Sequence, residues 1–546
     1  MKKSLIAFVV LLFVHLLTYA EGITSIEAER TARQFLLEHQ LLSRGTDDKK
    51  GLDLRLECVT KDCFIFNEVQ NVGWVAVSGQ NMVVAYSIDD TIDIKGLSAE
   101  KQDILNEYFQ RVAKIENWEP ITNRQEVKPM LHTEWGQDAP YNLMTPIIKS
   151  SKNDSVGNHA LTGCVATAIA QIMKYYQWPK KVKDIPFIRD VLPATAIDWD
   201  IIKDQYEPSD SSKAAWEVSK LMYYVGASIC TGYNTYGSGA WMPTAVVGME
   251  RYLDYSPNSL CYYAISINQP EEKAWKILDG MAYHEIVNNR PFIFLLAIDN
   301  LGAHAIDVDG YSQDGYYHFN WGWNGECNGY YLLPKQVVPY NGNDVACEGL
   351  FNGLMGILPN TGETDNGRRN LYLYDLEISE GKIYERVSEN DDFRISLSKR
   401  FEYIYPDTVN LQVGFAIYKD GELVDLPKTC YTERVCYEEG SLRFYYDIGA
   451  GLKDGVYELR SVSRKEGTEE WIFDTLEENF RLIAVIEDNR LKLYYEIDYS
   501  SGIKNVNYPF ENTHFLNGFF DFQGRRLNVA PLKGIYIKDG RKFVSK

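Results

Sequence analysis

The sequence predicts an α+β protein made of several domains. At 546 residues the chain is longer than one hydrophobic core can fill, and a typical domain length of ~150 residues suggests three or four domains. Helical and strand patterns alternate up to about residue 359, whereas short alternating strands with turn signals follow residue 370. A mixed helix-and-strand region followed by an antiparallel β-region is therefore expected.

The N-terminus has the pattern of a secretory signal. Lys2 and Lys3 precede an apolar run from Leu5 to Leu17, and Thr18-Tyr19-Ala20 then places small residues at the positions that a signal peptidase recognises. A retained anchor is the alternative, but the run is short for a membrane span of ~20 residues. We expect a signal peptide over residues 1–20, cleavage after Ala20, and a secreted or cell-surface attached protein with no later membrane span.

Charge and cysteine content narrow the class of protein further. A formal net charge of −20 argues against nucleic acid or an anionic membrane as partner, since both require a basic surface. Among the 9 cysteines, setting Cys164 aside leaves pairs that are close in sequence, and we expect bridges at Cys58/Cys63 and Cys430/Cys436. The full connectivity stays open, because eight cysteines allow about 105 pairings. Without a CxxC pair or an HExxH run, we expect no metal and no cofactor.

The first predicted domain after the signal spans residues 21–125. An amphipathic pattern predicts a helix over Ser25–Leu42, and a second helical period runs from Leu97 to Val112. Between them, strands are expected over residues 63–68, 73–78 and 82–87. The domain ends at Asn123-Arg124-Gln125-Glu126, which reads as an exposed link open to cleavage.

Three further segments follow. Residues 126–359 are mixed α and β, and a polar linker occupies residues 359–367. Residues 370–490 predict an antiparallel β-sandwich with no catalytic grouping. Residues 491–546 form a β-rich tail that reads as two hairpins, either a plain extension of the sandwich or a signal that sorts the protein to the cell surface.

Cys164 carries the strongest chemical signal. Ala166, Ile169, Ala170 and Met173 follow a helical period that begins at Gly163-Cys164. The thiol is therefore expected at a helix N-terminus, where the macrodipole and free N–H groups favour the reactive thiolate. The alternative is a small buried cysteine that only packs the start of the helix.

Three other residues fit a site around this cysteine. Strands predicted over 303–310 and 316–321 flank the turn at 313–315, and counting back from the turn sets His304 roughly opposite residues 321–325. Asn320 could then hold the imidazole of His304 by a hydrogen bond, and Trp321 could shield that bond from water. Gln137, in a polar loop upstream, could donate to an oxyanion together with the Cys164 N–H. Each of these residues taken alone could equally have a structural role.

Taken together, Gln137, Cys164, His304 and Asn320 follow the order found in papain-fold peptidases, with the histidine about 140 residues after the cysteine. Four motifs resemble the streptopain family: Gln137-Asp138-Ala139-Pro140-Tyr141-Asn142, Gly163-Cys164-Val165-Ala166-Thr167-Ala168, Ala303-His304-Ala305 and Asn320-Trp321-Gly322-Trp323.

The resemblance implies a papain-like catalytic domain over residues 126–359. It makes Cys164 the nucleophile, His304 the general acid/base, Gln137 the oxyanion donor, Asn320 the imidazole orienter and Trp321 the shield. Ser238 and Gly239 lie in a segment similar to a substrate-cleft loop, and Ala303 is the third implied substrate-binding residue. Residues 21–125 resemble the family's propeptide, which implies a prodomain that acts as an intramolecular inhibitor.

The sequence thus predicts a secreted cysteine endopeptidase made as a zymogen, acting on protein or peptide substrates. Two other functions remain open. An acyltransferase would use the same residues with another nucleophile in place of water. A surface adhesin would carry a vestigial peptidase domain and bind through its β-modules.

Overall fold

The structure is a computed structural model. The residues it describes are 19–20, 22–44, 52–60, 62–68, 73–115, 124–149, 157–187, 190–255, 260–263, 265–266, 271–298, 302–334, 338–339, 353–357, 359, 372–377, 382–403, 409–427, 431–435, 438–473, 480–497, 519–520, 526–527, 534–538 and 541–545. Nearly all of the predicted signal peptide, the polar linker and the cysteines of the 430/436 pair lie outside these residues. Within them, no helix has both the length and the apolar character that a membrane crossing needs.

The chain divides into two compact units, which are described separately. The first contains residues 1–254, 263–266 and 270–359, and the second contains residues 360–546 with two short segments, 255–262 and 267–269. The helices of the first unit are α2 (Ser25–Arg44), α3 (Ala99–Val112), α4 (Cys164–Tyr176), α5 (Lys213–Ser228), α6 (Met242–Tyr252) and α7 (Glu271–Val287). Mixed helices and strands here, and strands in the second unit, confirm the predicted α+β class.

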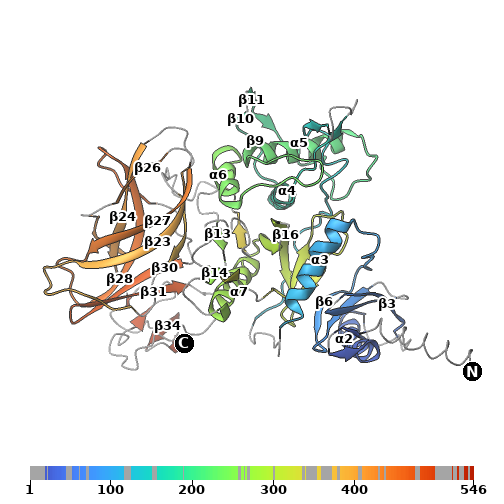
Figure 1. The fold of residues 1–546 in the computed structure, drawn as a ribbon, viewed down its shortest axis with the longest axis horizontal. Helices are drawn as coiled ribbons and strands as arrows, with labels where there is room; N and C mark the ends of the chain where they lie inside the picture. Colours follow the sequence, from blue (N-terminus) through green and yellow to red (C-terminus); the bar gives the residue numbers. More distant parts are fainter. Residues whose placement is uncertain are drawn as a thin grey trace, which may run out of the picture. The chain divides into compact units, whose positions relative to one another are not determined.

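A single sheet runs through the predicted prodomain and the predicted catalytic domain. Its strands follow the order β20-β15-β16-β17-β18-β6-β5-β4-β3. They are β3 (Leu54–Val59), β4 (Cys63–Glu68), β5 (Gly73–Ser78), β6 (Val83–Ser87), β15 (Phe292–Ile298), β16 (Gly302–Tyr311), β17 (Tyr317–Asn320), β18 (Gly329–Tyr331) and β20 (Gly353–Gly356). The two domains meet where β6 pairs antiparallel with β18, placing Tyr86 opposite Tyr330 and Ala85 opposite Tyr331. Figure 1 shows β6 and β3 beside α2 at the N-terminal end of this unit.

Most of the remaining strands of the first unit are short. They are β1 (Tyr19–Ala20), β2 (Ile23–Thr24), β7 (Ile147–Ile148), β8 (Asn158–His159), β9 (Lys181–Val182), β10 (Ile185–Phe187), β11 (Asp190–Leu192), β12 (Thr195–Ala196), β14 (Ile265–Ser266) and β19 (Val338–Pro339). Strand β13 (Leu260–Tyr263) spans the boundary between the units.

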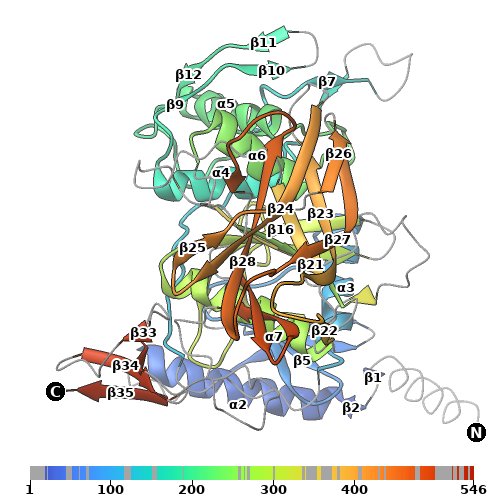
Figure 2. The same cartoon turned by 90° about the vertical axis from the view of Figure 1, so that its left-hand side faces the viewer.

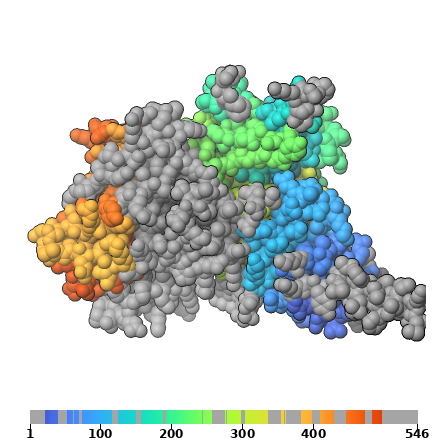
Figure 3. Space-filling view, in the orientation of Figure 1, coloured from blue at the N-terminus to red at the C-terminus, as the bar shows by residue number. Residues whose placement is uncertain are grey.

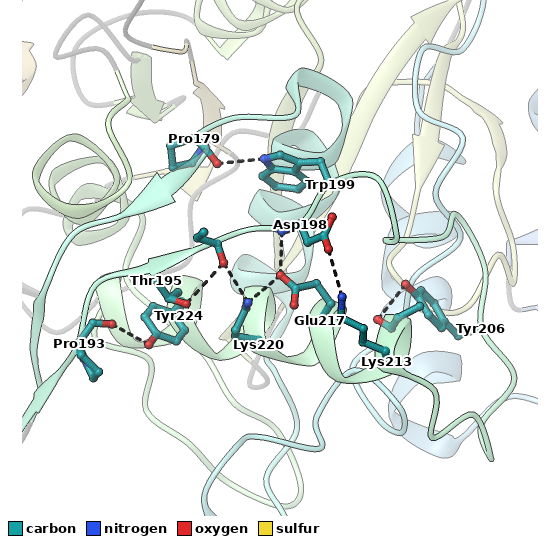
Figure 4. Close-up of polar contacts among 12 residues, drawn as sticks. Pro179, Pro193, Thr195, Asp198, Trp199, Tyr206, Lys213, Glu217, Lys220 and Tyr224 are labelled. Carbon is teal, nitrogen blue, oxygen red and sulfur yellow. Dashed lines mark hydrogen bonds and ion pairs between the residues drawn. The ribbon is translucent and has the colours of Figure 1, made fainter.

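Helix α4 is buried between its neighbours and fixes the position of Cys164. Every residue from Val165 to Met173 is buried. At its far end, Lys174 Nζ donates to the carbonyls of Trp199 and Ile202, at 3.2 and 2.8 Å. The segment with Trp199 is in turn held on α5, where Glu217 Oε1 accepts from the backbone N–H of Asp198 at 2.8 Å (Figure 4). The cysteine helix is therefore anchored at the end away from the thiol.

In the predicted link, Gln125 and Glu126 are exposed as expected, but the side chain of Arg124 is buried, which corrects the expectation for that residue. Arg124 makes two hydrogen bonds to the carboxylate of Asp279 on α7, at 3.1 and 2.7 Å, and the two side chains are 4% and 2% exposed. Val127 then forms an antiparallel bridge with Tyr311 at the end of β16. A lone arginine in a polar sequence reads as exposed because its acidic partner lies far along the chain.

The predicted Cys58/Cys63 disulfide is wrong. Both cysteines carry free thiols, because β3 and β4 pair with Cys58 opposite Ile65. Cys63 is instead buried, with its sulfur 3.9 Å from the carbonyl oxygen of Phe109 on α3. The two cysteines are close in sequence and lie on adjacent strands. They are not opposite each other, so the geometry that a disulfide requires is not met.

The second unit contains the predicted antiparallel β-sandwich. One sheet has the order β21-β23-β27, and the other has the order β22-β31-β30-β28-β24-β25, with β26 and β29 beside it. The strands are β21 (Tyr372–Glu377), β22 (Tyr384–Glu385), β23 (Phe393–Tyr403), β24 (Val409–Lys419), β25 (Glu422–Asp425), β26 (Tyr431–Val435), β27 (Glu438–Ile448), β28 (Gly455–Lys465), β29 (Ile472–Phe473), β30 (Phe480–Glu487) and β31 (Arg490–Ile497). Figure 2 shows β24 and β28 running side by side. Buried residues of both sheets, including Phe393, Tyr446, Leu411 and Leu482, form one core.

The end of the sandwich differs from the predicted boundary at residue 490. Strand β31 pairs with β30 as far as Ile497, so the β-sheet module extends through this strand. Beyond it, β32 (Phe519–Phe520) pairs with β33 (Arg526–Leu527), and β34 (Gly534–Lys538) pairs with β35 (Arg541–Ser545). The two predicted hairpins are confirmed. Their proposed role in sorting stays a prediction.

Candidate active site

Cys164 is the first residue of α4, as the helical pattern predicts. The residue before it, Gly163, has φ of 90°, a conformation that side chains other than glycine rarely adopt. A Cβ at Gly163 would also lie 2.8 Å from the carbonyl oxygen of Ser238. Glycine therefore lets the chain turn sharply into the helix while the Ser238 segment packs against the turn.

The pKa of the Cys164 thiol is raised above its usual value. Burial is the main cause that raises its pKa, and the carboxylate of Glu100 adds to the rise. Hydrogen bonds from the backbone N–H groups of Ala305, Val165 and Cys164 itself act in the opposite direction but do not outweigh burial. The expected benefit of the helix N-terminus is thus offset in the full-length chain.

His304 lies on β16, next to the residue whose N–H contacts the thiol. Its Nε2 is 3.0 Å from the carbonyl oxygen of Trp321, and its ring stacks against Trp321 and Trp323 with centroid distances of 6.0 and 5.0 Å. Because a carbonyl oxygen only accepts, Nε2 carries the proton and Nδ1 is left as the basic nitrogen. Burial lowers the pKa of His304 to about 4, Lys101 contributes in the same direction, and the Trp321 carbonyl opposes both.

Asn320 does not contact His304, which departs from the predicted role. Its Nδ2 donates to the carbonyl of Thr133 at 2.6 Å, and its Oδ1 accepts from the N–H of Gly322 at 3.0 Å. The hairpin register explains the difference: Asn320 faces Asp307, so His304 is carried past it toward Trp321 and Trp323. His304 therefore lies opposite residues 321–325, as predicted. Its hydrogen-bond partner is the backbone carbonyl of Trp321, however, and not the side-chain amide of Asn320.

Gln137 lies beside the turn that leads into α4. Its carbonyl oxygen accepts from the N–H of Thr162 at 3.0 Å and from the Thr162 hydroxyl at 3.4 Å. Gln137 is half-buried. Its loop is thus tied to the segment immediately before Cys164, as an oxyanion donor in this position would require.

The three predicted substrate-binding residues lie around the same turn and strand. Ser238 is buried, and its hydroxyl donates to the carbonyl of Asn234 at 3.0 Å, which closes the loop on itself. Gly239 exchanges backbone hydrogen bonds with Gly232, and a Cβ built on Gly239 would meet no atom within 4 Å. Ala303 precedes His304 on β16 and faces Ala297 of β15. The space beside Gly239 is consistent with a subsite.

Two charged residues of α3 also reach this site. Glu100 interacts electrostatically with Cys164, and its Oε1 lies 3.6 Å from a Cβ built at Gly237, in the predicted cleft loop. Lys101 pairs with Glu326 at 2.6 Å, and its Nζ is 5.6 Å from the centroid of the Trp323 ring. Adjacent charges on an amphipathic helix are usually solvated, so the sequence offered no signal for either residue.

Further along α3, Tyr108 contacts the wall of the catalytic domain. It is buried, its ring lies 5.2 Å from that of Tyr331 and 6.0 Å from that of Trp321, and its hydroxyl donates to the carbonyl of Leu332 at 2.8 Å. The space-filling view shows the light-blue surface of α3 adjoining the green surface of the catalytic domain (Figure 3).

Comparison with known proteins finds similar proteins over the region that contains this site. The model of the Peptidase C10 family matches residues 135–331, which contain the site residues predicted from the sequence: Gln137, Cys164, Ser238, Gly239, Ala303, His304, Asn320 and Trp321. The thiol protease/hemagglutinin PrtT of Porphyromonas gingivalis is 27% identical over 374 residues, which cover 61% of this chain and 41% of that protein. Streptopain of Streptococcus pyogenes is 25% identical over 376 residues, which cover 61% of this chain and 91% of that protein.

Among solved structures, a fragment of prointerpain A from Prevotella intermedia aligns with a TM-score of 0.44 and 23% identity, covering 56% of this chain and 98% of that fragment. The chain spans less than half of PrtT and most of streptopain. The family model and both curated relatives agree on one class of enzyme, so residues 135–331 of this chain resemble a streptopain-like cysteine peptidase.

Proposed function

We propose that the protein is an exported bacterial cysteine endopeptidase, made as a zymogen, that hydrolyses peptide bonds with Cys164 and His304. The observation that carries this proposal is that the N-terminus of α4 lies against the part of β16 that carries His304. The thiol lies at the N–H of Ala305, next to His304, and Trp321 holds Nε2 so that Nδ1 is the basic nitrogen. Export is supported by the signal-like sequence of residues 1–20.

The chemistry is acyl transfer. His304 Nδ1 takes the thiol proton, and the Cys164 thiolate attacks the peptide carbonyl carbon to form a tetrahedral intermediate. Gln137 and the Cys164 N–H donate to its oxyanion, and the resulting imidazolium then gives its proton to the leaving amine. Water, deprotonated by His304, hydrolyses the thioester and restores the free thiol.

The contacts of the first 115 residues support an intramolecular inhibitor. Active cysteine peptidases require a thiolate beside an imidazolium. Helix α3 brings the opposite charges: the anion Glu100 acts on the thiol, and the cation Lys101 acts on the imidazole. Both charges favour the neutral thiol and the neutral imidazole, in the same direction as burial, which is the larger cause.

The direct test uses the full chain with and without Cys164→Ala. Under reducing conditions we expect the wild type to shorten itself and to cleave an unfolded protein substrate. Cys164→Ala should lower turnover by a factor of about 10⁴ or more. Cys58→Ser is the matched control, because it changes another half-buried thiol far from α4. Equal cleavage by the wild type and Cys164→Ala would refute the proposal.

The role of Gln137 has its own test. In the processed enzyme, Gln137→Ala should lower kcat by about 10²–10³ because one oxyanion donor is lost. Alkylation of Cys164 by iodoacetamide forms no oxyanion and should keep its rate. Gln125→Ala, at an exposed glutamine, is the control. If Gln137→Ala turns over substrate at the wild-type rate, Gln137 has no part in the mechanism.

A further inference from the structure

Gln171 lies at the meeting point of the chain segments that carry the reaction. It follows Cys164 by two helical turns, on the same side of α4, and its side chain is fully buried. Its amide contacts the strand of His304, the residue before Trp321 and the loop of Gln137.

The contacts use both ends of the amide. Gln171 Nε2 donates to Asp307 Oδ2 at 2.7 Å and lies 3.3 Å from Asn320 Oδ1. Gln171 Oε1 accepts from the backbone N–H of Trp135 at 3.2 Å and from Asn320 Nδ2 at 3.3 Å. A buried amide that satisfies both its donor and its acceptor groups in this way fixes the relative position of the segments it joins.

Asn320 extends this network toward the catalytic histidine. Its Oδ1 accepts from Gly322, so it holds the residues on either side of Trp321, whose carbonyl binds His304 Nε2. Asn320 thus acts on His304 through the Trp321 backbone. It does so without touching the ring.

Asp307 is an unusual partner for this amide. Its side chain is fully buried, and its Oδ1 has no hydrogen-bond partner. Burial raises the pKa of Asp307, and Asp309 on the same strand adds to the rise, while the Gln171 donor opposes it. Asp309 itself is paired with His318 at 2.6 Å. The Gln171 amide donates to this buried carboxyl and so joins α4 to β16.

We propose that Gln171 is a positioning residue of the peptidase reaction, which sets the register of α4 against β16 through Asp307 and the orientation of His304 through Asn320 and Trp321. The inference rests on the proposed function of Cys164 and His304. Its observable consequence is a thiolate–imidazolium pair that forms only when this amide is intact.

The test compares Gln171→Glu with the double variant Gln171→Glu/Asp307→Asn. Glutamate keeps the size of the side chain but faces an oxygen toward Asp307, so the single variant should separate α4 from β16. In the double variant the amide introduced at position 307 donates to the glutamate, which restores the hydrogen bond in the reverse direction. Each full-length variant is processed by tagged mature wild type, which is then removed, and Tyr175→Phe is the control on the same helix.

We expect Gln171→Glu to lower kcat by about 10- to 100-fold with KM changed less than about threefold, because binding is untouched and positioning is lost. Iodoacetamide alkylation of Cys164 should lose its reactivity near neutral pH, and the double variant should recover most of both. Wild-type kcat and alkylation profile in folded Gln171→Glu would overturn the proposal. So would a loss of kcat with an unchanged alkylation profile and no rescue.

If Gln171→Glu does not fold, Asn320→Ala takes its place, and the same fall in kcat and the same change in alkylation are expected. A folded Asn320→Ala with wild-type behaviour would overturn the proposal. Alkylation also separates this inference from the proposed function. Should the wild type cleave no peptide bond, the proposed function fails, whereas the pH profile of Cys164 in the variants still reports whether Gln171 positions the pair.

Discussion

Two N-terminal segments contact the catalytic domain in different ways. Helix α3 reaches the site with Glu100 and Lys101, whose contacts act on the charges of Cys164 and His304. Residues 124–131 instead run along the end of β16, held by a buried ion pair and by backbone hydrogen bonds to Asp309 and Tyr311. We predict that processing withdraws the first set of contacts and retains the second, with the cut on the N-terminal side of Arg124.

The largest expected effect concerns Arg124. Arg124→Met leaves the carboxylate of Asp279 buried without its cation, so we expect a loss of about 3–5 kcal/mol in the free energy of unfolding. Denaturant unfolding in the Cys164→Ala background measures it, with Lys128→Met as the exposed control. The double variant Arg124→Met/Asp279→Leu should lose much less.

N-terminal sequencing of the mature enzyme should also find Arg124 retained. A mature chain that begins after Arg124, or an Arg124→Met protein as stable as its parent, would remove the distinction between the two segments.

A smaller effect is expected at α3. Glu100→Gln/Lys101→Met removes both charges that oppose the thiolate–imidazolium pair. The thiol pKa of Cys164 should fall and the pKa of His304 should rise, and a change of one pKa unit corresponds to tenfold. We therefore expect Cys164 in the full-length double variant to be alkylated faster than in the parent at neutral pH, as followed by intact mass. Asp103→Asn, on the exposed side of the same helix, should not change the rate. An unchanged rate in the double variant would mean that α3 acts by coverage alone.

The smallest effect lies at the far end of the prodomain. His39 Nε2 on α2 binds Asp314 Oδ2 at 2.5 Å. Burial opposes the charge on His39, but the hydrogen bonds to Asp314 and to the Phe35 carbonyl prevail and raise its pKa. A raised pKa means that the pair stabilises docking fully below the unfolded value of ~6.5, and that this stability is lost as the pH rises through the folded value.

The partly exposed pair is worth about 1 kcal/mol or less. In the Cys164→Ala background, His39→Gln should lower the unfolding midpoint at mildly acidic pH, and the difference from the parent should shrink toward alkaline pH. His132→Gln, at an exposed histidine, is the control. A difference that grows with pH would show that the assigned sign is wrong.

The local sequence pattern predicted helices and strands well where the residues of a single segment determine its secondary structure. Residues 63–68 and 73–78 form strands with the expected bounds, because mainly apolar runs of this length are buried on both faces. Cys164 begins its helix as predicted, since Gly163 supplies the turn.

The predictions that were wrong share one cause: each residue contacts another residue that is distant in the sequence. Arg124 reads as exposed until Asp279 is placed beside it, and Asn320 reads as the partner of His304 until the hairpin register turns it toward Asp307. Glu100 and Lys101 became site residues only through the docking of α3. The sequence contains both halves of each contact, but nothing local says that they meet.

The short junction between β6 and β18 has a consequence for the two products of processing. In the described residues, the ladder between the prodomain sheet and the catalytic sheet has two residue pairs. If the prodomain leaves as proposed, each product would expose a strand edge with few free backbone groups. Long, flat edges recruit other chains and aggregate, whereas very short ones do so poorly. We expect such a narrow join to let the prodomain sheet separate from the catalytic sheet with little newly exposed strand edge.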